Sequence, residues 1–379
     1  MNVIISGGGT GGHIFPAIAI ANAVRRLDPS ARILFVGALG RMEMQRVPQA
    51  GYKIIGLPIQ GFDRKNLLKN LKVLYKVWKS QRMAKQIIRD FQPDVAVGVG
   101  GYASGPLLNQ AAAMGVPCLI QEQNSYAGVT NKLLAKKASV ICTAYEGMER
   151  FFPKEKILLT GNPVRQRLLE EDITRDEACS MFGLDTQKKT ILLVGGSLGA
   201  RTINESVLQH LDLVRRRQDV QFLWQTGKYY SEEIARRLAE QAASEGSTDV
   251  ATAFPNLHVT DFIQDMAAAY RVADLVISRA GAGSISEFCL LGLPVVLVPS
   301  PNVAEDHQTK NAMALVGKQA AIYVKDADAP ATLLETAVKT VNDRQLLESL
   351  SANIKKLALP DSATIIAEQV MRLAIDTTT

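Results

Sequence analysis

The sequence predicts an α/β protein made of two Rossmann-like domains, each with a doubly wound parallel sheet. Short apolar runs alternate with helical patterns along most of the 379 residues, as is typical of βαβ units. The alternation restarts after a polar, charged stretch at residues 170–189. Each half also opens with an apolar run followed by a glycine-rich turn. A chain of this length is sufficient for two cores of ordinary size.

The elements follow in order along the chain. In the first half, the strand-like runs are 3–6, 32–36, 53–57, 94–98, 117–121, 139–142 and 157–160, and the helical patterns are 16–27, 66–89, 104–114 and 128–137. In the second half, the strand-like runs lie near 190–195, 220–224, 257–259, 274–278, 294–298 and 320–324. Pro360-Asp361 predicts a break before a last helix at 362–375. The sequence leaves open whether this helix packs on the first or on the second half. We expect domains of residues 1–163 and 164–360, with a cleft between them.

Three glycine-rich turns of one design recur at residues 7–13, 98–105 and 195–201. Each follows an apolar run and precedes a helical pattern, so it places backbone N–H groups at a helix N-terminus. Such a turn is a site for diphosphate or another anionic oxygen. Glycine also makes ordinary strand-to-helix turns, but three such turns favour anion binding.

The first turn matches the dinucleotide pattern GxGxxG at Gly7, Gly9 and Gly12. A NAD site also needs an acidic residue at the end of the second strand to hold the ribose hydroxyls. The run at 32–36 instead ends in Gly37-Ala38. The missing acid disfavours a NAD(P) site.

The second half offers a better nucleotide pocket at residues 278–287. A strand ends there in a small-residue turn that opens a helix, and Glu287 lies about one turn inside that helix. The turn's N–H groups suit a phosphate and the carboxylate suits two ribose hydroxyls. The alternative is that Glu287 only favours its own helix dipole. A polar cluster at 305–311 is expected near the same crevice or, alternatively, is a solvated helix start.

Metal coordination has little support in the sequence. Asp326 and Asp328 resemble the DxD pair that holds a divalent ion, but Ala329-Pro330 and a helical run follow. An Asp at the helix N-cap with Pro at the helix start explains the segment more simply. Helix dipoles and N–H groups would then stabilise a leaving diphosphate.

Two side chains are candidates for proton transfer. His13 closes the first glycine turn, where a neutral imidazole suits a general base; the alternative is a local helix cap. Glu122 follows an apolar run and is the other carboxylate placed to face the cleft, or it serves to orient loops.

Charge is divided unevenly along the chain. Residues 1–165 hold 22 Lys and Arg against 9 Asp and Glu, a net +13, and the remaining residues carry −7. Nine of the basic residues fall within 64–89 with no acid among them, interleaved with apolar residues at helical spacing. This pattern favours an amphipathic helix on an anionic membrane surface over plain core packing. Nucleic acid is disfavoured because neither a helix-turn-helix nor an aromatic stacking platform is evident.

Cysteine usage and the apolar pattern indicate the compartment. The four cysteines form no CxxC pair, and the apolar surroundings of Cys118 and Cys142 suggest buried, reduced thiols. No signal-peptide pattern is evident and no apolar run is long enough to span a membrane. We expect a cytosolic protein that is neither secreted nor membrane-spanning.

These motifs together resemble one family closely, the MurG family of bacterial peptidoglycan glycosyltransferases. The resemblance runs through nearly the whole chain and rests on GGGTGGHIFPA from Gly7, GGYASGP from Gly100, QEQNSYAGVTNK from Gln121, GNPVR from Gly161, GGSLGAR from Gly195 and SRAGAGSISE from Ser278. It implies a GT-B fold and a C-terminal helix, residues 361–379, that returns to the first domain. It also implies inverting transfer of N-acetylglucosamine from UDP-N-acetylglucosamine to the muramyl 4-hydroxyl of undecaprenyl-diphospho-muramyl-pentapeptide.

The resemblance also implies site residues, carried over by position, without a cofactor or a metal ion. Donor binding is implied for Thr10, Gly11, Gly12, Asn124, Arg165, Ser197, Phe262, Ile263, Gly283, Ser284, Glu287, His307 and Gln308. Binding of the acceptor diphosphate is implied for Gly9, Gly11, Gly12, Gly101, Tyr102 and Ser104. Contact with an anionic phospholipid surface, on the cytoplasmic face of the membrane, is implied for Leu67, Lys69, Leu71, Lys72, Leu74, Tyr75, Lys76, Trp78 and Lys79. Cell-wall synthesis and division proteins are implied as partners.

Two positions depart from the pattern, and two rival functions stay open. Some relatives have Gln where this chain has His307, and many have His where it has Gln121. The rivals are a GT-B transferase with another acceptor, such as a diglyceride, and a non-catalytic scaffold that binds nucleotide sugars.

Overall fold

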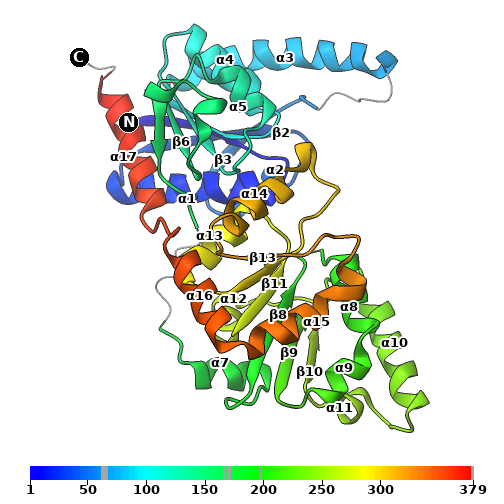
Figure 1. Ribbon diagram of the computed structural model, residues 1–379. Helices are drawn as coiled ribbons and strands as arrows, with labels where there is room; N and C mark the ends of the chain where they lie inside the picture. The colour runs from blue at the N-terminus through cyan, green and yellow to red at the C-terminus, as the bar shows by residue number, and fades with distance from the viewer. Residues whose placement is uncertain (61–66, 165–167, 169–171, 197, 377–379) are drawn as a thin grey trace. The chain divides into compact units, whose positions relative to one another are not determined.

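The computed structural model describes residues 1–60, 67–164, 168, 172–196 and 198–376. The chain forms two compact units (Figure 1). Unit 1 comprises Met1–Val164 and Leu359–Thr379, and unit 2 comprises Arg165–Ala358. Both divisions fall within two residues of the expected domain boundaries.

Unit 1 contains a parallel sheet of seven strands, and all seven were expected from the sequence. The strands are β1 (Asn2–Gly7), β2 (Arg32–Ala38), β3 (Lys53–Leu57), β4 (Val95–Gly100), β5 (Cys118–Glu122), β6 (Val140–Thr143) and β7 (Ile157–Leu159). Their order in the sheet is β3-β2-β1-β4-β5-β6-β7. The order reverses between β1 and β4, so the carboxyl ends of these two strands form the switch point where such sheets bind ligands.

The helices of unit 1 cover both faces of this sheet. They are α1 (Gly11–Leu27), α2 (Glu43–Gln49), α3 (Leu67–Phe91), α4 (Ser104–Ala113), α5 (Val129–Leu134) and α17 (Ser362–Asp376), with 3₁₀ turns at Met148–Arg150 and Lys154–Lys156. α1 begins five residues earlier than expected because the second half of the glycine turn is already helical. α5 is shorter than the expected helix, and α2 was not expected.

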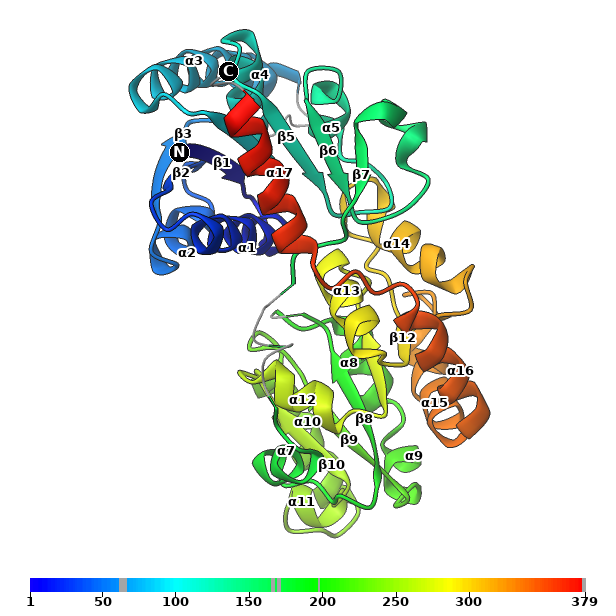
Figure 2. The ribbon, with the colours of Figure 1, turned by 90° about the vertical axis from the view of Figure 1, so that its left-hand side faces the viewer.

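Strand alternation divides the core of unit 1 between the two sheet faces. Ile4 points to the face covered by α3, α4 and α5. Val3 and Ile5 point to the other face, where they join a core that includes Ile366 and Val370 of α17. α17 packs beside α1 there (Figures 1 and 2). The C-terminal helix therefore completes the core of unit 1.

Unit 2 repeats the same architecture with six parallel strands, again all expected. They are β8 (Lys189–Val194), β9 (Val220–Gln225), β10 (Leu257–Thr260), β11 (Leu275–Ser278), β12 (Val295–Leu297) and β13 (Ile322–Tyr323). The sheet order is β10-β9-β8-β11-β12-β13, with the reversal between β8 and β11. The third glycine turn follows β8 and the turn at 278–283 follows β11, so both lie at this second switch point.

The helices of unit 2 lie between these strands. They are α7 (Arg175–Phe182), α8 (Arg201–Leu208), α9 (Leu211–Arg216), α10 (Ser231–Ser244), α11 (Val250–Ala253), α12 (Met266–Val272), α13 (Ala282–Leu291), α14 (His307–Val316), α15 (Ala329–Asn342) and α16 (Arg344–Lys355), with a 3₁₀ turn at Ala304–Asp306. α7 was missed in the polar stretch at 170–189. Its signal was the capping box of Thr174 and Glu177, which the structure contains.

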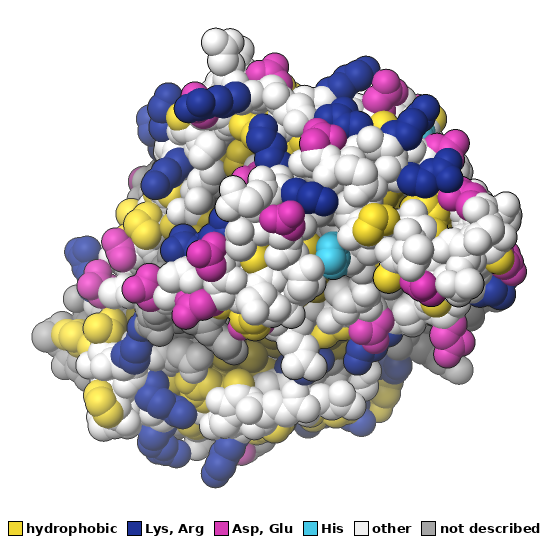
Figure 3. Space-filling model, turned by 90° about the horizontal axis from the view of Figure 1, so that it is seen from below, with side chains coloured by type: hydrophobic (Ala, Val, Ile, Leu, Met, Phe, Trp, Pro, Cys, Tyr) yellow, Lys and Arg dark blue, Asp and Glu magenta, His cyan; other side chains and the backbone are white. Residues whose placement is uncertain are grey.

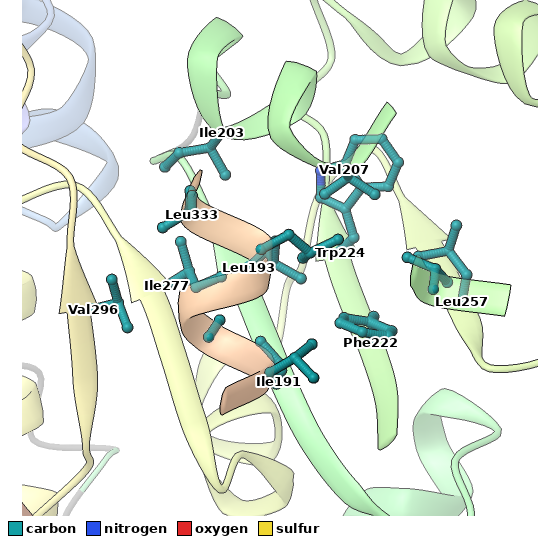
Figure 4. Packing of buried hydrophobic residues seen from close by; sticks show 14 of the residues in the cluster. Ile191, Leu193, Ile203, Val207, Phe222, Trp224, Leu257, Ile277, Val296 and Leu333 are labelled. Carbon is teal, nitrogen blue, oxygen red and sulfur yellow. The ribbon is translucent and has the colours of Figure 1, made fainter. Parts of the chain in front are cut away.

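α8 and α15 pack on one face of the sheet in unit 2 (Figure 4). Ile191 and Leu193 of β8 lie beside Phe222 and Trp224 of β9 beneath these helices. Trp224 is fully buried and its indole N–H donates to Asn204 Oδ1 of α8 at 2.9 Å. This contact fixes α8 on the sheet and so sets the direction of its N-terminus.

All four cysteines are buried and unpaired, as expected for Cys118 and Cys142. Burial raises the pKa of the Cys118, Cys142 and Cys289 thiols to about 12. Because the thiolate is the reactive form, these thiols are chemically inert in the folded chain.

Candidate functional site

The first two glycine turns touch each other at the switch point of unit 1. The Gly8 N–H donates to the Gly100 carbonyl at 3.3 Å. Gly101 has a φ of +90°, and a Cβ there would overlap the backbone of Gly8. Only glycine fits this close approach. The turns after β1 and β4 therefore form one surface.

His13 lies on this surface in the first turn of α1. Its Nδ1 is 3.0 Å from the Gly8 carbonyl oxygen and 3.4 Å from Thr10 Oγ1. A carbonyl only accepts, so Nδ1 carries the hydrogen and Nε2 is the basic nitrogen. The ring lies against Gly100, where a Cβ would be 2.8 Å from Nε2. Thus the basic nitrogen, Nε2, lies where the two turns meet. Nδ1 makes a bond to the local backbone, as expected if His13 caps the helix start.

The start of α1 carries the other residues predicted in this turn. Thr10 occupies the N-cap position, but no side chain caps the helix. Thr10 and Gly12 are exposed and Gly11 is partly exposed. The His13 N–H donates to the Thr10 carbonyl at 3.1 Å, so the N–H groups of Gly11 and Gly12, at the uncapped start of the helix, are the ones that suit an anion.

Glu43 is a residue of this region that the sequence analysis missed. It is the first residue of α2, and its side chain is completely buried. Its carboxylate accepts from the Gly9 N–H at 2.9 Å and from the Ala38 N–H at 3.0 Å. The Gly9 N–H predicted to bind diphosphate is therefore engaged within the protein. Since Glu43 is buried, it does not supply the exposed acid that a NAD ribose needs.

The second turn divides its predicted residues between surface and interior. Tyr102 is 47% exposed. Ser104, in contrast, is fully buried, and its hydroxyl lies 2.9 Å from the Gly100 carbonyl and 3.1 Å from the Ser6 carbonyl. This hydroxyl braces the ends of β1 and β4, so Tyr102 and the exposed backbone are what the turn presents to a ligand.

Glu122 is nearly buried and bonded within its own loop. One carboxylate oxygen accepts from the Asn124 N–H at 3.0 Å. The other accepts from the Gly128 N–H at 3.0 Å and from Asn131 Nδ2 at 2.8 Å. This geometry favours the loop-orienting role over the proton-accepting role. The same bonds hold Asn124 beside the loop.

Gln121, where many relatives have His, belongs to a buried amide network. Its Nε2 donates to Asn162 Oδ1 at 2.9 Å, and Asn162 Nδ2 donates to the Gln123 carbonyl at 3.0 Å. Gln121 is fully buried. The departure therefore falls on a position that joins β5 to the GNP turn.

The N-terminus of α13 in unit 2 has free space in front of it. Gly281 occupies the N-cap position without a capping side chain. A Cβ at Gly281 or Gly283 would meet nothing within 4 Å. Gly283 is exposed and Ser284 is partly exposed. An uncapped helix N-terminus with free space in front suits a diphosphate.

Glu287 lies one turn inside this helix. It is 6% exposed and accepts from the Tyr270 hydroxyl of α12 at 2.9 Å. That bond holds the carboxylate in place at the carboxyl edge of the sheet, and little of the side chain reaches the surface.

Phe262 and Ile263, both predicted to bind the donor, differ in exposure. Phe262 is 40% exposed, and Lys228 Nζ lies 5.6 Å from its ring centre. The Ile263 N–H already donates to Gln225 Oε1 at 3.0 Å, while Gln225 Nε2 donates to the Gly196 carbonyl at 2.9 Å. Gln225, which was not predicted from the sequence, therefore ties the third glycine turn to the segment predicted to bind the donor.

The segment before α14 has a strained backbone. Glu305 and Asp306 have φ values of 54° and 51°, which non-glycine residues rarely adopt. His307 is the first residue of α14 and is partly exposed. Gln308 Oε1 accepts from the Ser300 N–H at 2.8 Å. His307 and Gln308, both predicted to bind the donor, thus begin a helix that follows two residues with a strained backbone.

Asp326 is not arranged as half of a metal-binding pair. It forms an ion pair with Arg279 and accepts from Thr202 Oγ1 at 2.6 Å. Asp328 takes the N-cap position of α15, followed by Pro330 in the first turn, but its side chain makes no capping bond. Within the described residues, no group of three or more His, Cys, Asp or Glu side chains is arranged to hold a metal ion.

α3 exposes apolar side chains that a core helix would bury. Leu74 is 55% exposed, Tyr75 60% and Trp78 55%. The core is instead met by other positions of the helix, among them Val73 and Ala84. The core-packing alternative is therefore wrong for Leu74 and Trp78. Lys79 is exposed beside them, while Lys76 donates to Gln60 Oε1 at 2.6 Å.

Several predicted residues lie outside what the structure describes. These are Arg165 and Ser197, together with the side chains of Leu67, Lys69, Leu71 and Lys72. In the described part of the chain, no helix has the length and hydropathy needed to cross a bilayer. The face of the molecule in Figure 3 shows acidic and basic side chains intermixed.

Comparison with known proteins gives the same family for both halves. Residues 3–143 match the glycosyltransferase family 28 N-terminal domain, and residues 190–366 match the family 28 C-terminal domain. The chain is similar to the UDP-N-acetylglucosamine--N-acetylmuramyl-(pentapeptide) pyrophosphoryl-undecaprenol N-acetylglucosamine transferases of Bacteroides fragilis and Porphyromonas gingivalis. The B. fragilis protein is 66% identical, over 99% of this chain and 96% of the relative. The P. gingivalis protein is 53% identical, over 98% of this chain and 96% of the relative.

Solved structures agree with this assignment. The crystal structure of Acinetobacter baumannii MurG matches with a TM-score of 0.76 and 28% identity, covering 98% of this chain and 99% of that one. A UDP-GlcNAc 2-epimerase from Neisseria meningitidis matches with a TM-score of 0.66 at 14% identity over 98% of this chain and 100% of the other, which shows the shared fold alone. With both domain models matched and relatives that align along almost its entire length, the chain belongs to glycosyltransferase family 28.

Proposed function

We propose that this chain transfers N-acetylglucosamine from UDP-N-acetylglucosamine to the muramyl sugar of undecaprenyl-diphospho-muramyl-pentapeptide. The observation that carries the proposal is the 66% identity over 99% of the chain to a relative whose name states this transfer. The first turn of α1 in unit 1 and the uncapped N-terminus of α13 in unit 2 support it, because both substrates contain a diphosphate.

Unit 2 takes the donor in this proposal. The N-terminus of α13 faces open space at Gly281 and Gly283, so its N–H groups bind the diphosphate of UDP. Glu287 takes the ribose hydroxyls from its fixed position beside Tyr270. The helix dipole and N–H groups then stabilise the charge that develops on departing UDP.

Unit 1 takes the acceptor and supplies the base. The first turn of α1 and the exposed part of the second turn bind the lipid diphosphate. His13 Nε2 accepts the proton of the muramyl 4-hydroxyl as that oxygen attacks the anomeric carbon and UDP leaves from the opposite face. The Gly8 carbonyl accepts from Nδ1–H, which leaves Nε2 as the nitrogen that accepts this proton.

α3 holds unit 1 on the cytoplasmic face of the membrane. The exposed Leu74, Tyr75 and Trp78 enter the interface, and neighbouring cations meet anionic headgroups. Replacement of Leu74 and Trp78 by Ser should abolish sedimentation with anionic vesicles while leaving transfer to a short-chain, soluble acceptor unchanged. Loss of vesicle sedimentation together with loss of transfer, or no loss of either, would contradict this role of α3.

The transfer is tested by UDP release from UDP-N-acetylglucosamine, with and without a short-chain lipid-linked muramyl-pentapeptide, in the presence of a chelator. Acceptor-dependent release that persists in chelator is the expected result. Release that needs an added divalent ion would contradict the metal-independent mechanism.

Two other outcomes would replace the proposed function. Turnover with a diglyceride but not with the muramyl lipid would identify a transferase with a different acceptor. Binding of UDP-N-acetylglucosamine without turnover on any acceptor would identify a scaffold.

A further inference from the structure

One peptide group at the first glycine turn is held from both ends by ionisable side chains. The peptide that joins Gly8 to Gly9 has the Gly8 carbonyl at one end and the Gly9 N–H at the other. The carbonyl lies 3.0 Å from His13 Nδ1, and the N–H donates to Glu43 Oε2 at 2.9 Å. Because a peptide group is planar and rigid, the orientation set at one end fixes the orientation at the other.

Glu43 is placed so that it has little freedom to move. Its second carboxylate oxygen accepts from the Ala38 N–H at the end of β2. A Cβ at Gly8 would overlap the carboxylate, and a Cβ at Gly37 would come within 2.6 Å of Glu43 Cγ. The side chain therefore fills a space that exists only because both neighbours are glycine.

A buried carboxylate is costly to desolvate unless hydrogen bonds compensate it. Here the compensating donors come from the ends of two different segments, the β1–α1 turn and strand β2. A glutamine in the same position would offer one acceptor oxygen and would direct its NH₂ group at the other N–H. Only the carboxylate satisfies both donors in this geometry.

We infer that Glu43 is a positioning residue for His13 and acts through the Gly8–Gly9 peptide. By fixing that peptide, Glu43 keeps the Gly8 carbonyl facing Nδ1 and so keeps Nε2 as the proton-accepting nitrogen. It also engages the Gly9 N–H, which leaves the first turn of α1 as the anion-binding part of this loop. The kinetic part of this inference rests on the proposed function.

The test compares Glu43→Gln with Asp94→Asn. Asp94 offers a related contact in the same unit: its partly buried carboxylate accepts a backbone N–H, that of Asn2 at 2.7 Å, at the start of β1. For Glu43→Gln we expect kcat to fall roughly 10- to 100-fold, as for loss of a charge-assisted hydrogen bond, with the KM for UDP-N-acetylglucosamine unchanged. Asp94→Asn should leave kcat within about twofold of the parent.

The second measurement does not depend on activity. The chain has only four histidines, so ¹⁵N NMR of the imidazoles resolves the His13 tautomer. In the parent, His13 should carry its hydrogen on Nδ1, and Glu43→Gln should shift the population towards the Nε2–H form. Glu43→Asp, which shortens the side chain but keeps its charge, should give a smaller shift and covers the case in which Glu43→Gln does not fold.

The outcomes separate the two proposals. An unchanged His13 tautomer in both Glu43 variants would overturn the inference, whatever the kinetics show. If the unmodified protein has the predicted His13 tautomer but transfers no sugar to the muramyl acceptor, the proposed function is wrong. The coupling of Glu43 to His13 through the Gly8–Gly9 peptide is not affected by that result. Equal losses of kcat in Glu43→Gln and Asp94→Asn would show that Glu43 contributes only to general stability.

Discussion

The two units share one topology, but the turns at their switch points differ: those of unit 1 are held by side-chain bonds, and the one before α13 in unit 2 is open. In unit 1 the turns after β1 and β4 contact each other, and Glu43, Ser104 and His13 bond to their backbone. In unit 2 the N-terminus of α13 is uncapped and faces open space. A shared fold therefore gives one braced surface in unit 1 and one open helix N-terminus in unit 2.

The largest expected effect comes from removing His13, the proposed base of unit 1. His13→Ala should lower kcat by about 10²- to 10⁴-fold, the usual contribution of a general base, with little change in the affinity for UDP. Steady-state kinetics together with calorimetric UDP binding measures both quantities. Near-normal turnover would show that His13 is not the general base. It would also weaken the assignment of proton transfer to unit 1 and donor binding to unit 2.

The matching change in unit 2 should act on binding. Glu287→Gln should raise the KM for UDP-N-acetylglucosamine by about 10- to 100-fold, since a charged acceptor of ribose hydroxyls is replaced by a neutral one. The KM for the lipid acceptor should not change. An effect on kcat alone would contradict the donor assignment.

Glycine replacement tests the contrast between a closed and an open turn. Gly101→Ala should destabilise unit 1 by about 2 kcal/mol or more, because its φ is +90° and its Cβ would overlap Gly8. Gly283→Ala should leave the melting temperature unchanged or slightly higher, because its surroundings are open, while it weakens UDP binding. Thermal unfolding of both variants checks the first part and calorimetry the second. Similar melting temperatures for the two variants would contradict the contrast.

The smallest expected effect is a pH dependence confined to unit 2. Burial, with a smaller contribution from nearby Lys188, lowers the pKa of His258 below its ordinary value of 6.5. The unfolded chain then binds more protons than the folded chain between the two pKa values, so stability falls as the pH drops below 6.5. His258→Gln should flatten this part of the stability curve in urea unfolding measured from pH 7.5 to 5. An unchanged slope would show that other groups cause it.

The strands and the glycine turns could be predicted because each depends on local sequence. An apolar run such as 191–194 followed by glycines is readable without knowledge of the fold. Glu43 could not be predicted in this way. The sequence shows that no acid ends the second strand, yet the chain folds back so that an acid five residues later meets the Ala38 N–H. α2, which carries Glu43, is short and contains Pro48, so its pattern gave no helix.

The same limit applies to the predicted site residues. Glu122 was chosen by residue type and position after a strand, and Ser104 by its place in a family motif, but the polar atoms of both are turned to backbone groups in the interior. Whether a polar side chain faces a ligand or braces a loop depends on rotamers and on distant neighbours. Exposed Leu74 and Trp78, in contrast, followed from charge and spacing on a single helix.

The return of the C-terminal helix to unit 1 has a practical consequence for dividing the chain. Residues 1–164 alone would leave bare the surface on which Ile366, Ala367 and Val370 pack. An excised first half would therefore expose apolar area to water and aggregate. A circularly permuted gene that begins at Leu359 and runs through a short linker into Met1 would encode unit 1 as one continuous piece. Acceptor and vesicle binding by that piece would then be measurable without the donor unit.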